Sequence, residues 1–419
     1  MRKVRPGWAL FVLAAISTCG FIDRVIMNVL VYPIKAEFRL SDTEVGLVGG
    51  FAFALLYVLL GIWVARIAER RRRITLIGVG TFFWSVATAL CAAATSFVAL
   101  FLARVGVGVG EAVGLPSSQS VISDYFPKEK RTTAISVFVL APPIGAFIGL
   151  TGGGIVAQEW GWRAAFLIAA APGFLLSALV LLSVDEPVRG QHDALGADGD
   201  RVPPLGAVLM RMWKRHSFRH LLIGSTIASM AGFGLNLFLT TWFVRRHGYS
   251  LAEAGLTTGL IASLPAVAGV VGCGWLCDRL ARRDARAYAD IPGWCLVITT
   301  PVYILAVTSG TPTMAIALLA VATFFQYNYL GPSQGLFQNL MHPRMRATST
   351  AVIGILYSLI GAGLGPVLVG GLSDRFADAH GPAGGLTMAL ALTALLYLWA
   401  AVHFFLARRS IRDDLAQPL

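Results

Sequence analysis

Residues 162–184 read WRAAFLIAAAPGFLLSALVLLSV, and a stretch of this kind decides the class of fold. Arg163 is its only charged residue. About 20 consecutive apolar residues are what a helix needs to cross the hydrocarbon core of a bilayer. The stretch does not alternate between polar and apolar positions, as a strand of a membrane barrel would. It therefore predicts a membrane-spanning helix.

The whole chain repeats this pattern. Of its 419 residues, 56% are hydrophobic and only 13% are charged, with a mean hydropathy of +0.70. A soluble domain carries about 25% charged residues. We therefore expect an all-α membrane protein with twelve spanning helices. The expected spans are residues 8–34, 45–65, 74–96, 98–122, 132–157, 162–184, 219–244, 252–276, 289–308, 312–338, 347–370 and 385–407.

The positive charge of the chain follows the membrane topology. The net charge is +12, and most of the 34 Lys and Arg residues lie at both termini and in one alternate set of loops. Cytoplasmic loops of membrane proteins carry such an excess. We therefore expect both termini in the cytoplasm of a bacterial inner membrane, and no nucleic-acid partner. The opposite set of loops holds only Lys35, Arg39, Arg163, Arg245, Arg246 and Arg375.

The two halves of the chain are internal repeats. Residues 40–47 (LSDTEVGL) recur as residues 249–256 (YSLAEAGL), and Pro-Ser at 116–117 recurs at 332–333. Repeated halves are typical of transporters that alternate about a central site. The predicted organisation is a six-helix half at residues 1–184, a cytoplasmic linker at 185–218 and a second six-helix half at 219–419.

Charged clusters mark the predicted cytoplasmic ends of corresponding helices. One contains Glu69, Arg70 and Arg73, and the other contains Asp278 and Arg279. Their positive charge anchors topology. We also predict that they form a cytoplasmic gate, because an acid beside basic residues can tie helix ends of the two halves together.

The sequence around these clusters resembles the loop signature of the major facilitator superfamily, Gly-x-Leu-x-Asp-Arg. Residues 274–279 (GWLCDR) match it, whereas residues 65–70 (ARIAER) have Ala65 in place of the glycine and glutamate in place of the aspartate. The resemblance implies the major facilitator fold, with two pseudo-symmetric six-helix halves.

Glycines at four-residue spacing lie on one face of two predicted spans. They are Gly145, Gly149 and Gly153 in one span and Gly361 and Gly365 in the other. Small residues let membrane helices approach closely. The pattern indicates either static packing or a contact that flexes during transport.

Four ionisable residues fall inside predicted spans: Asp23, Arg24, Arg104 and Glu111. A charge at the centre of the bilayer costs about 2.5–3.5 kcal/mol on insertion scales. These residues are either structural ion pairs or a site for a proton and an anion. We favour the second hypothesis, with Asp23 and Glu111 carrying protons and the arginines holding an anion.

The second half has no charged counterpart of this group. Arg24 aligns with Asn236, and Glu111 aligns with Tyr327. A structural ion pair is expected in both repeats, so the asymmetry favours a coupling site in the first half. The second half offers an apolar, amide-rich wall. Its predicted substrate contacts are Asn236, Gln326, Asn328 and Tyr357.

Several motifs together resemble the bacterial branch of the spinster family, most densely over residues 20–190. The motifs are residues 21–24 (FIDR), 33–38 (PIKAEF), 40–43 (LSDT), 104–112 (RVGVGVGEA), 124–127 (DYFP) and 161–163 (GWR).

The resemblance implies a proton-driven exporter of lysophospholipids or sphingosine phosphate. It makes Asp23 and Glu111 protonation sites and Arg24 and Arg104 ligands of the head group. The same charged residues also resemble those of proton-coupled symporters for sugar acids.

We therefore predict a proton-coupled secondary transporter of an anionic amphipathic lipid, working as a monomer among membrane lipids by alternating access. A symporter of a small organic anion is the alternative, and a transporter-like receptor or a lipid scramblase comes third. No catalytic cluster and no nucleotide-binding loop occurs, so we expect neither an enzyme nor a cofactor. The five cysteines lie in apolar stretches without the spacing of a metal site.

Overall fold

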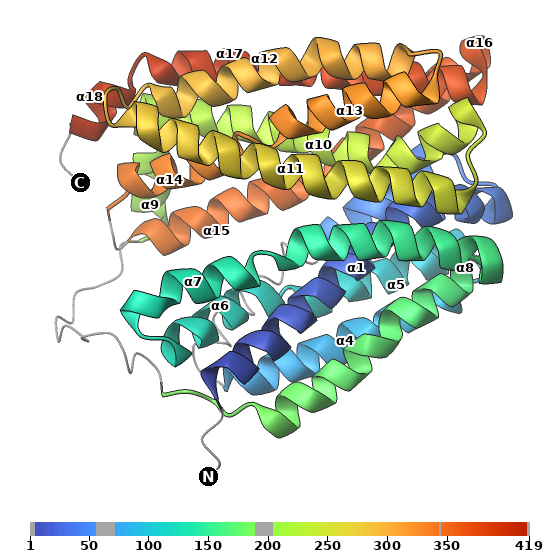
Figure 1. Ribbon diagram of the computed structural model, residues 1–419, viewed down its shortest axis with the longest axis horizontal. Coiled ribbons are helices and arrows are strands. Elements are labelled where there is room, and N and C mark those ends of the chain that lie inside the picture. The colour runs from blue at the N-terminus through green and yellow to red at the C-terminus, as the bar shows by residue number, and fades with distance from the viewer. Residues whose placement is uncertain (1–4, 56–71, 189–203, 343–344, 417–419) are drawn as a thin grey trace. The chain divides into compact units, whose positions relative to one another are not determined.

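The computed structural model describes residues 5–55, 72–188, 204–342 and 345–416 (Figure 1). In these ranges the chain is almost entirely helical and contains no strand. The contacts divide the chain into two compact units. Unit 1 holds residues 1–40, 47–198 and 249–259, and unit 2 holds residues 41–46, 199–248 and 260–419. The main division falls within the stretch 185–218.

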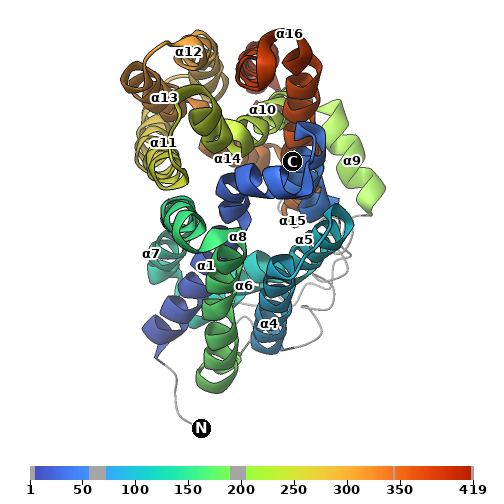
Figure 2. The same ribbon diagram turned by 90° about the vertical axis from the view of Figure 1, so that its right-hand side faces the viewer.

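Each unit is a bundle of long helices that lie side by side (Figures 1 and 2). Unit 1 contains α1 (Pro6–Phe38), η1 (Leu47–Phe51), α4 (Arg73–Ala92), α5 (Phe97–Glu111), α6 (Gly114–Tyr125), α7 (Lys128–Phe138) and α8 (Ala141–Ser183). Unit 2 contains α2 (Asp42–Gly46), α9 (Leu205–Lys214), α10 (His216–His247), α12 (Ala287–Thr308), α13 (Pro312–Gln326), α14 (Leu330–Leu340), α15 (Arg346–Leu356), η3 (Tyr357–Leu364), α16 (Gly365–Ala394), α17 (Leu396–Arg408) and α18 (Ile411–Ala416). The helix α11 (Leu251–Ala281) begins in unit 1 and continues in unit 2.

Eight helical stretches of the described residues are long and apolar enough to cross a membrane. Two of them, 133–183 and 348–408, are longer than one crossing needs. A glycine with positive φ interrupts each one, Gly161 at 83° and Gly381 at 69°. Only glycine adopts such φ values readily. The expected pairs of spans are therefore joined by a turn at a single glycine instead of by a loop.

The core of unit 1 lies between α1, α4, α6, α7 and α8. Leu13 and Ile16 of α1 pack with Trp84 of α4, Val121 of α6 and Phe138 of α7, and all five side chains are buried. This cluster holds the middle of α1 against α4. It thereby fixes the position of the charged residues about two to three turns further along α1.

The predicted glycine face of residues 145–153 packs directly on α1. A Cβ atom at Gly145 would lie 2.6 Å from Phe21 Cβ and 2.8 Å from Thr18 O. Close helix contact is therefore what these glycines provide. The glycines of the second half do the same in unit 2, since Gly365 packs against the main chain at Met230.

We expect Gly145→Ala to lower the free energy of unfolding by about 1–3 kcal/mol, the usual cost of an overpacked contact. The reason is that neither Phe21 Cβ nor the Thr18 carbonyl can move without shifting α1. Gly152→Ala on the same helix is the matched control, because no atom lies within 4 Å of the added methyl group. Thermal unfolding of the two purified variants in the same detergent measures the difference. Equal stability would show that the helices are free to separate at Gly145.

Candidate functional site

The four charged residues predicted inside the spans meet in unit 1. Asp23 and Arg24 lie in the middle of α1, Arg104 lies in α5, and Glu111 is the last residue of α5. The side chain of Arg104 is fully buried, and Asp23 and Glu111 are nearly so. Buried charges in a membrane helix bundle need partners. The contacts of these four residues therefore define the site.

Arg24 and Glu111 form an ion pair that joins α1 to α5. Arg24 Nη2 donates to Glu111 Oε2 at 2.6 Å. The Arg24 guanidinium also lies over the rings of Phe21 and Phe53, at 5.1 and 4.6 Å from their centroids. Its side chain is 30% exposed, whereas that of Glu111 is 5% exposed. The arginine therefore faces a more open space than its carboxylate partner.

Arg104 contacts the main chain of Asp23, whereas Arg24 and Glu111 meet through their side chains. Thr88 Oγ1 of α4 donates to Asp23 Oδ2, and Arg104 Nη1 donates to the main-chain oxygen of Asp23 at 3.3 Å. Within the described part of the chain, Asp23 Oδ1 and the Nε and Nη2 atoms of Arg104 have no hydrogen-bond partner. An arginine buried with two unpartnered donors is suited to bind an oxyanion.

A cavity of about 80 Å³ opens beside the Arg24–Glu111 pair. Trp84, Ser118 and Phe138 complete its wall together with the two charged residues. Since about 10–15 Å³ of such volume is enough to hold one water molecule, the cavity has room for several waters. Glu111 Oε1 is buried without a partner among the described residues. Water in this cavity can bring a proton to the carboxylate.

The corresponding residues of unit 2 also meet each other. Asn236 Nδ2 of α10 donates to Tyr327 Oη at 2.5 Å. Asn236 and Tyr327 are the residues that the repeat aligns with Arg24 and Glu111. Corresponding residues of the two repeats thus form an ion pair within unit 1 and a neutral hydrogen bond within unit 2. This pairing agrees with the alignment that the sequence predicted.

Both contacts sit where a spanning helix is interrupted. The regular α-helix stops at Glu111, between α5 and α6, and at Gln326, between α13 and α14. Interrupted helices in repeated halves are where many transporters bind substrates and ions. The sequence carried a signal for the breaks, because Gly114 and Gly331 each precede a proline by one or two residues.

Two of the other predicted contacts of unit 2, Gln326 and Asn328, are buried at this break. Gln326 and Asn328 are each 2% exposed, and Tyr357 opens the π-helical stretch η3. Asn328 Nδ2 donates to Cys295 Sγ at 3.5 Å, so this amide packs on a cluster of buried thiols with Cys273. Contact of these residues with a substrate stays a prediction.

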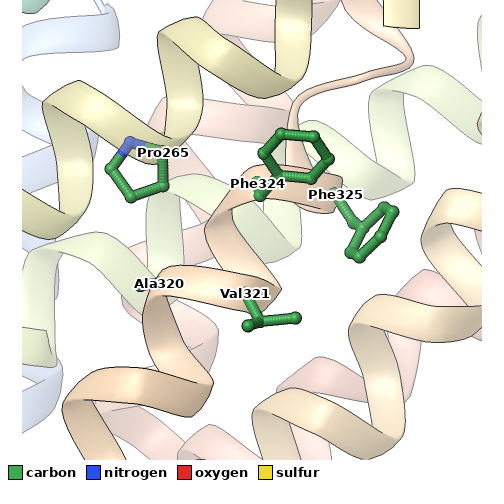
Figure 3. A pocket seen from close by; sticks show the side chains of 5 residues that line it. All are labelled: Pro265, Ala320, Val321, Phe324 and Phe325. Atoms are coloured by element: carbon green, nitrogen blue, oxygen red, sulfur yellow. The ribbon is translucent and has the colours of Figure 1, made fainter. Parts of the chain in front are cut away.

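An apolar cavity of about 410 Å³ lies in unit 2 between α11 and α13 (Figure 3). Its lining consists of Pro265 of α11 and of Ala320, Val321, Phe324 and Phe325 of α13, and Figure 3 shows Phe324 on the side of Pro265. Every lining side chain is apolar. Val321 and Phe324 are exposed, so the cavity is an open apolar hollow at the surface of unit 2 that a hydrocarbon chain can contact.

The predicted cytoplasmic gate is described only in part. Glu69 and Arg70 lie outside the described residues. Asp278 accepts a hydrogen bond from Tyr288 Oη at 3.0 Å, and the Arg279 guanidinium lies over the Trp275 ring at 5.3 Å. Their role in a gate stays a prediction.

Arg73 lies in a buried network within unit 1. It donates to Asp124 Oδ2 at 2.5 Å, to Glu186 Oε1 at 2.7 Å and to Ser120 Oγ at 2.8 Å. These bonds join the ends of α4 and α6 to the segment after α8. In this structure Arg73 stabilises one unit, and its predicted part in a gate has no support from these contacts.

Sequence reasoning missed a second charged cluster, in unit 2. Asp42 is 2% exposed and accepts two hydrogen bonds from Arg245, both at 2.8 Å. Ser373 Oγ donates to the same carboxylate at 2.6 Å. The Asp374 carboxylate accepts from the main-chain N–H groups of Asp42 and Thr43, each at 2.8 Å. Residues 41–46 therefore pack with α10 and α16, although the chain on both sides of them belongs to unit 1.

Comparison with known proteins identifies the family. The family model of the Major Facilitator Superfamily matches residues 12–366. The chain belongs to this superfamily. It is therefore an integral membrane protein of a transporter family, with the major facilitator fold that the sequence predicted.

Solved structures and curated relatives of this major facilitator protein include spinster proteins. A bacterial homologue of the human lysosomal transporter Spinster, in an inward-facing and unoccupied conformation, aligns over 100% of both chains with a TM-score of 0.91 and 30% identity. The sphingosine-1-phosphate transporter SPNS2 of Danio rerio is 23% identical, covering 91% of this chain and 78% of the relative. The predicted resemblance to spinster proteins is confirmed.

Two further relatives have other names. An MFS-type efflux pump of Mycolicibacterium smegmatis is 33% identical, covering 99% of this chain and 95% of the pump. A probable L-galactonate transporter of Escherichia coli is 26% identical, covering 97% of this chain and 90% of the relative. Relatives of this superfamily member thus include proteins named for lipid, organic-anion and efflux transport.

Proposed function

We propose that this protein is a proton-coupled secondary transporter that moves an anionic amphipathic lipid by alternating access. The observation that carries the proposal is the Arg24–Glu111 ion pair, which lies partly buried within unit 1 beside a small cavity. Head groups of the lysophospholipid or sphingosine-phosphate type have the charge that Arg24 and Arg104 recognise.

The ion pair links proton binding to anion binding. While Glu111 is ionised, its carboxylate neutralises Arg24 and competes with an anionic substrate. When Glu111 takes up a proton, the attraction within the pair falls and the guanidinium becomes available to an anion. One site can therefore take up a proton together with an anion, provided that access to it alternates between the two sides of the membrane. Asp23, held by Thr88 and next to Arg104, is a second candidate proton carrier.

The apolar cavity of unit 2 supports a lipid over a sugar acid. A hydrocarbon chain gains free energy by burial against Pro265, Val321 and Phe324, whereas the hydroxyl groups of a sugar acid lose their hydrogen bonds there. The spinster relatives, one of them named as a sphingosine-1-phosphate transporter, point the same way.

Alternating access requires contacts that can form and break between the repeats. The repeated segments 40–47 and 249–256 supply two candidates. Residues 41–46 pack in unit 2, and residues 249–259 pack in unit 1, where Gly255 meets Leu150 and Gly154 of α8. Each segment is thus grouped with the unit of the other repeat. Both belong to the loops that the charge distribution places outside the cytoplasm of a bacterial cell, with the termini inside.

Transport into proteoliposomes tests the proposal. A labelled lysophospholipid and a labelled sugar acid are each offered with and without an imposed pH gradient. We expect the lipid to accumulate only with the gradient, and the sugar acid not to move. Lipid movement of equal rate without the gradient would indicate a scramblase and overturn the coupling.

A proton-coupled symporter of a small organic anion is the second candidate. The probable L-galactonate transporter among the relatives favours it, as does the unit 1 cavity, whose wall includes Arg24 and can therefore hold a carboxylate. Gradient-driven uptake of the sugar acid alone would establish this function and leave the apolar cavity as a packing defect.

We expect Arg24→Ala to weaken binding of an anionic lysophospholipid by about 10- to 100-fold, the factor for losing one charge-assisted hydrogen bond. A zwitterionic lysolipid should lose much less, because its ammonium group already balances the phosphate. Competition of each lipid with the labelled substrate gives the two affinities. Arg24→Lys keeps the charge and serves as the control. An equal loss for both lipids would show that Arg24 only holds α1 against α5.

A further inference from the structure

The helix α9 has two different faces within the segment that joins the two repeats. Val208 and Met212, one turn apart, are buried against α10 and α15. Arg211 Nε donates to Leu340 O at 3.5 Å and fixes the helix from the side. This face attaches α9 to unit 2.

The opposite face of α9 is apolar and exposed. It consists of Leu205, Leu209, Met210 and Trp213, and Trp213 is 62% exposed. Large apolar residues at i, i+4 and i+8 form a continuous stripe along a helix. Soluble proteins rarely expose such a stripe without a partner.

Cations border this stripe at its C-terminal end. Lys214 is exposed, and the Arg219 guanidinium of the next helix lies over the Trp213 ring at 5.3 Å. Arg219 Nη2 also contacts His216 Nδ1 at 3.0 Å. The stripe therefore ends in an aromatic ring and two cations, the side chains that favour the boundary between water and lipid.

The direction of α9 fits that boundary. The helix ends at Arg215, whose extended backbone (φ −76°, ψ 108°) separates it from α10. Arg215 also contacts α18, because its Nη1 donates to the main-chain oxygen of Asp414. In Figure 1 α9 lies at one end of unit 2, and in Figure 2 it runs across the direction of the long helices. A helix across the end of a membrane bundle lies along the membrane surface.

We propose that α9 is an interfacial helix that binds anionic phospholipids of the cytoplasmic leaflet. Leu209, Met210 and Trp213 insert among the upper parts of the acyl chains, and Lys214 and Arg219 bind the lipid phosphates. The occupant is a lipid surface because the face combines an apolar stripe with cations at one edge. The stripe matches the acyl chains of a lipid, and the cations match its anionic head group. This site is separate from the transport site of unit 1.

Fluorescence of Trp213 tests the proposal in the full-length chain. The emission of Trp213 is obtained by subtracting that of the Trp213→Phe protein, each in nanodiscs. Phosphatidylglycerol brominated in the upper part of its acyl chains is titrated against unlabelled phosphatidylcholine at constant total lipid. We expect strong quenching at a low fraction of the anionic lipid and little quenching by iodide in the water.

Lys214→Gln combined with Arg219→Gln should raise the midpoint of this titration by about 10- to 30-fold, the factor for two cations at an anionic surface. Arg282→Gln combined with Arg283→Gln removes the same charge from the end of α11 and should leave the midpoint unchanged.

Three outcomes would overturn the proposal. Free access of iodide to Trp213 would place α9 in water. Equal quenching by brominated phosphatidylcholine would remove the preference for anionic lipid. Shielding of Trp213 from both quenchers would show that protein covers α9, either a second copy or another part of the chain.

Discussion

Glu111→Gln is expected to abolish proton-driven accumulation of substrate while leaving the protein folded. The amide keeps the shape of the side chain and can still accept a hydrogen bond from Arg24, but it cannot take up a proton. One coupled proton supports about tenfold accumulation for each unit of imposed pH difference, because one pH unit equals 1.36 kcal/mol. In the variant this accumulation ratio should fall to about one. Uptake into proteoliposomes with a gradient of one unit measures it.

Gradient-free exchange of substrate is the companion measurement for Glu111→Gln. It should persist, because the variant still has Arg24 and the apolar cavity of unit 2. Asp378→Asn, which removes an exposed carboxylate from α16, is the matched control and should accumulate substrate like the natural protein. Normal accumulation by Glu111→Gln would show that the proton travels elsewhere, and Asp23 would be the next residue to change.

Asp42→Asn is expected to release residues 41–46 from unit 2. The carboxylate accepts hydrogen bonds from Nη1 and Nη2 of Arg245, whose side chain is only 9% exposed. Removing one partner of a buried ion pair costs about 3–5 kcal/mol, since the other charge is left unpaired. The alternating-access proposal makes this segment a contact that must break during each cycle. The conformation in which it is docked should therefore become much less populated.

A cross-link reports whether the segment is docked. A Cβ atom at Gly371 would lie 3.8 Å from Thr43 Oγ1, so cysteines at these two positions are within reach of a disulfide. The Thr43→Cys, Gly371→Cys protein should cross-link rapidly and stop transporting until it is reduced. Adding Asp42→Asn should slow the cross-link at least tenfold, whereas Arg246→Gln, a change of the exposed neighbour, should not. Transport by the cross-linked protein would rule out movement of this segment.

The fold and the charged residues of the unit 1 site could be predicted from residue patterns. Apolar blocks of spanning length predicted the helices, and the repeats aligned Arg24 with Asn236 and Glu111 with Tyr327. The sequence did not predict that Asn236 meets Tyr327, but the contact agrees with the alignment, because repeated halves place corresponding residues in corresponding contacts. The resemblance to spinster proteins pointed to the same charged residues, and the comparisons agree with it.

Contacts between loop ends did not follow from the sequence. Asp42 begins α2 and Arg245 lies in the last turn of α10, and positive-inside counting assigns their side of the membrane but not their partners. Arg73 was expected at a gate because it belongs to a basic run, and the structure pairs it with Asp124 and Glu186. Packing brings together helix ends that are far apart in the chain. The spacing of residues along the sequence does not indicate which helix ends will meet.

The most direct test of proton-coupled transport is the movement of protons with the substrate. Proteoliposomes containing a trapped pH-sensitive dye are given an anionic lysophospholipid with no imposed gradient. The proposed coupling predicts that the internal pH changes when the natural protein moves the lipid, and that Glu111→Gln leaves it constant. Lipid movement by the natural protein without any change of internal pH would contradict the account.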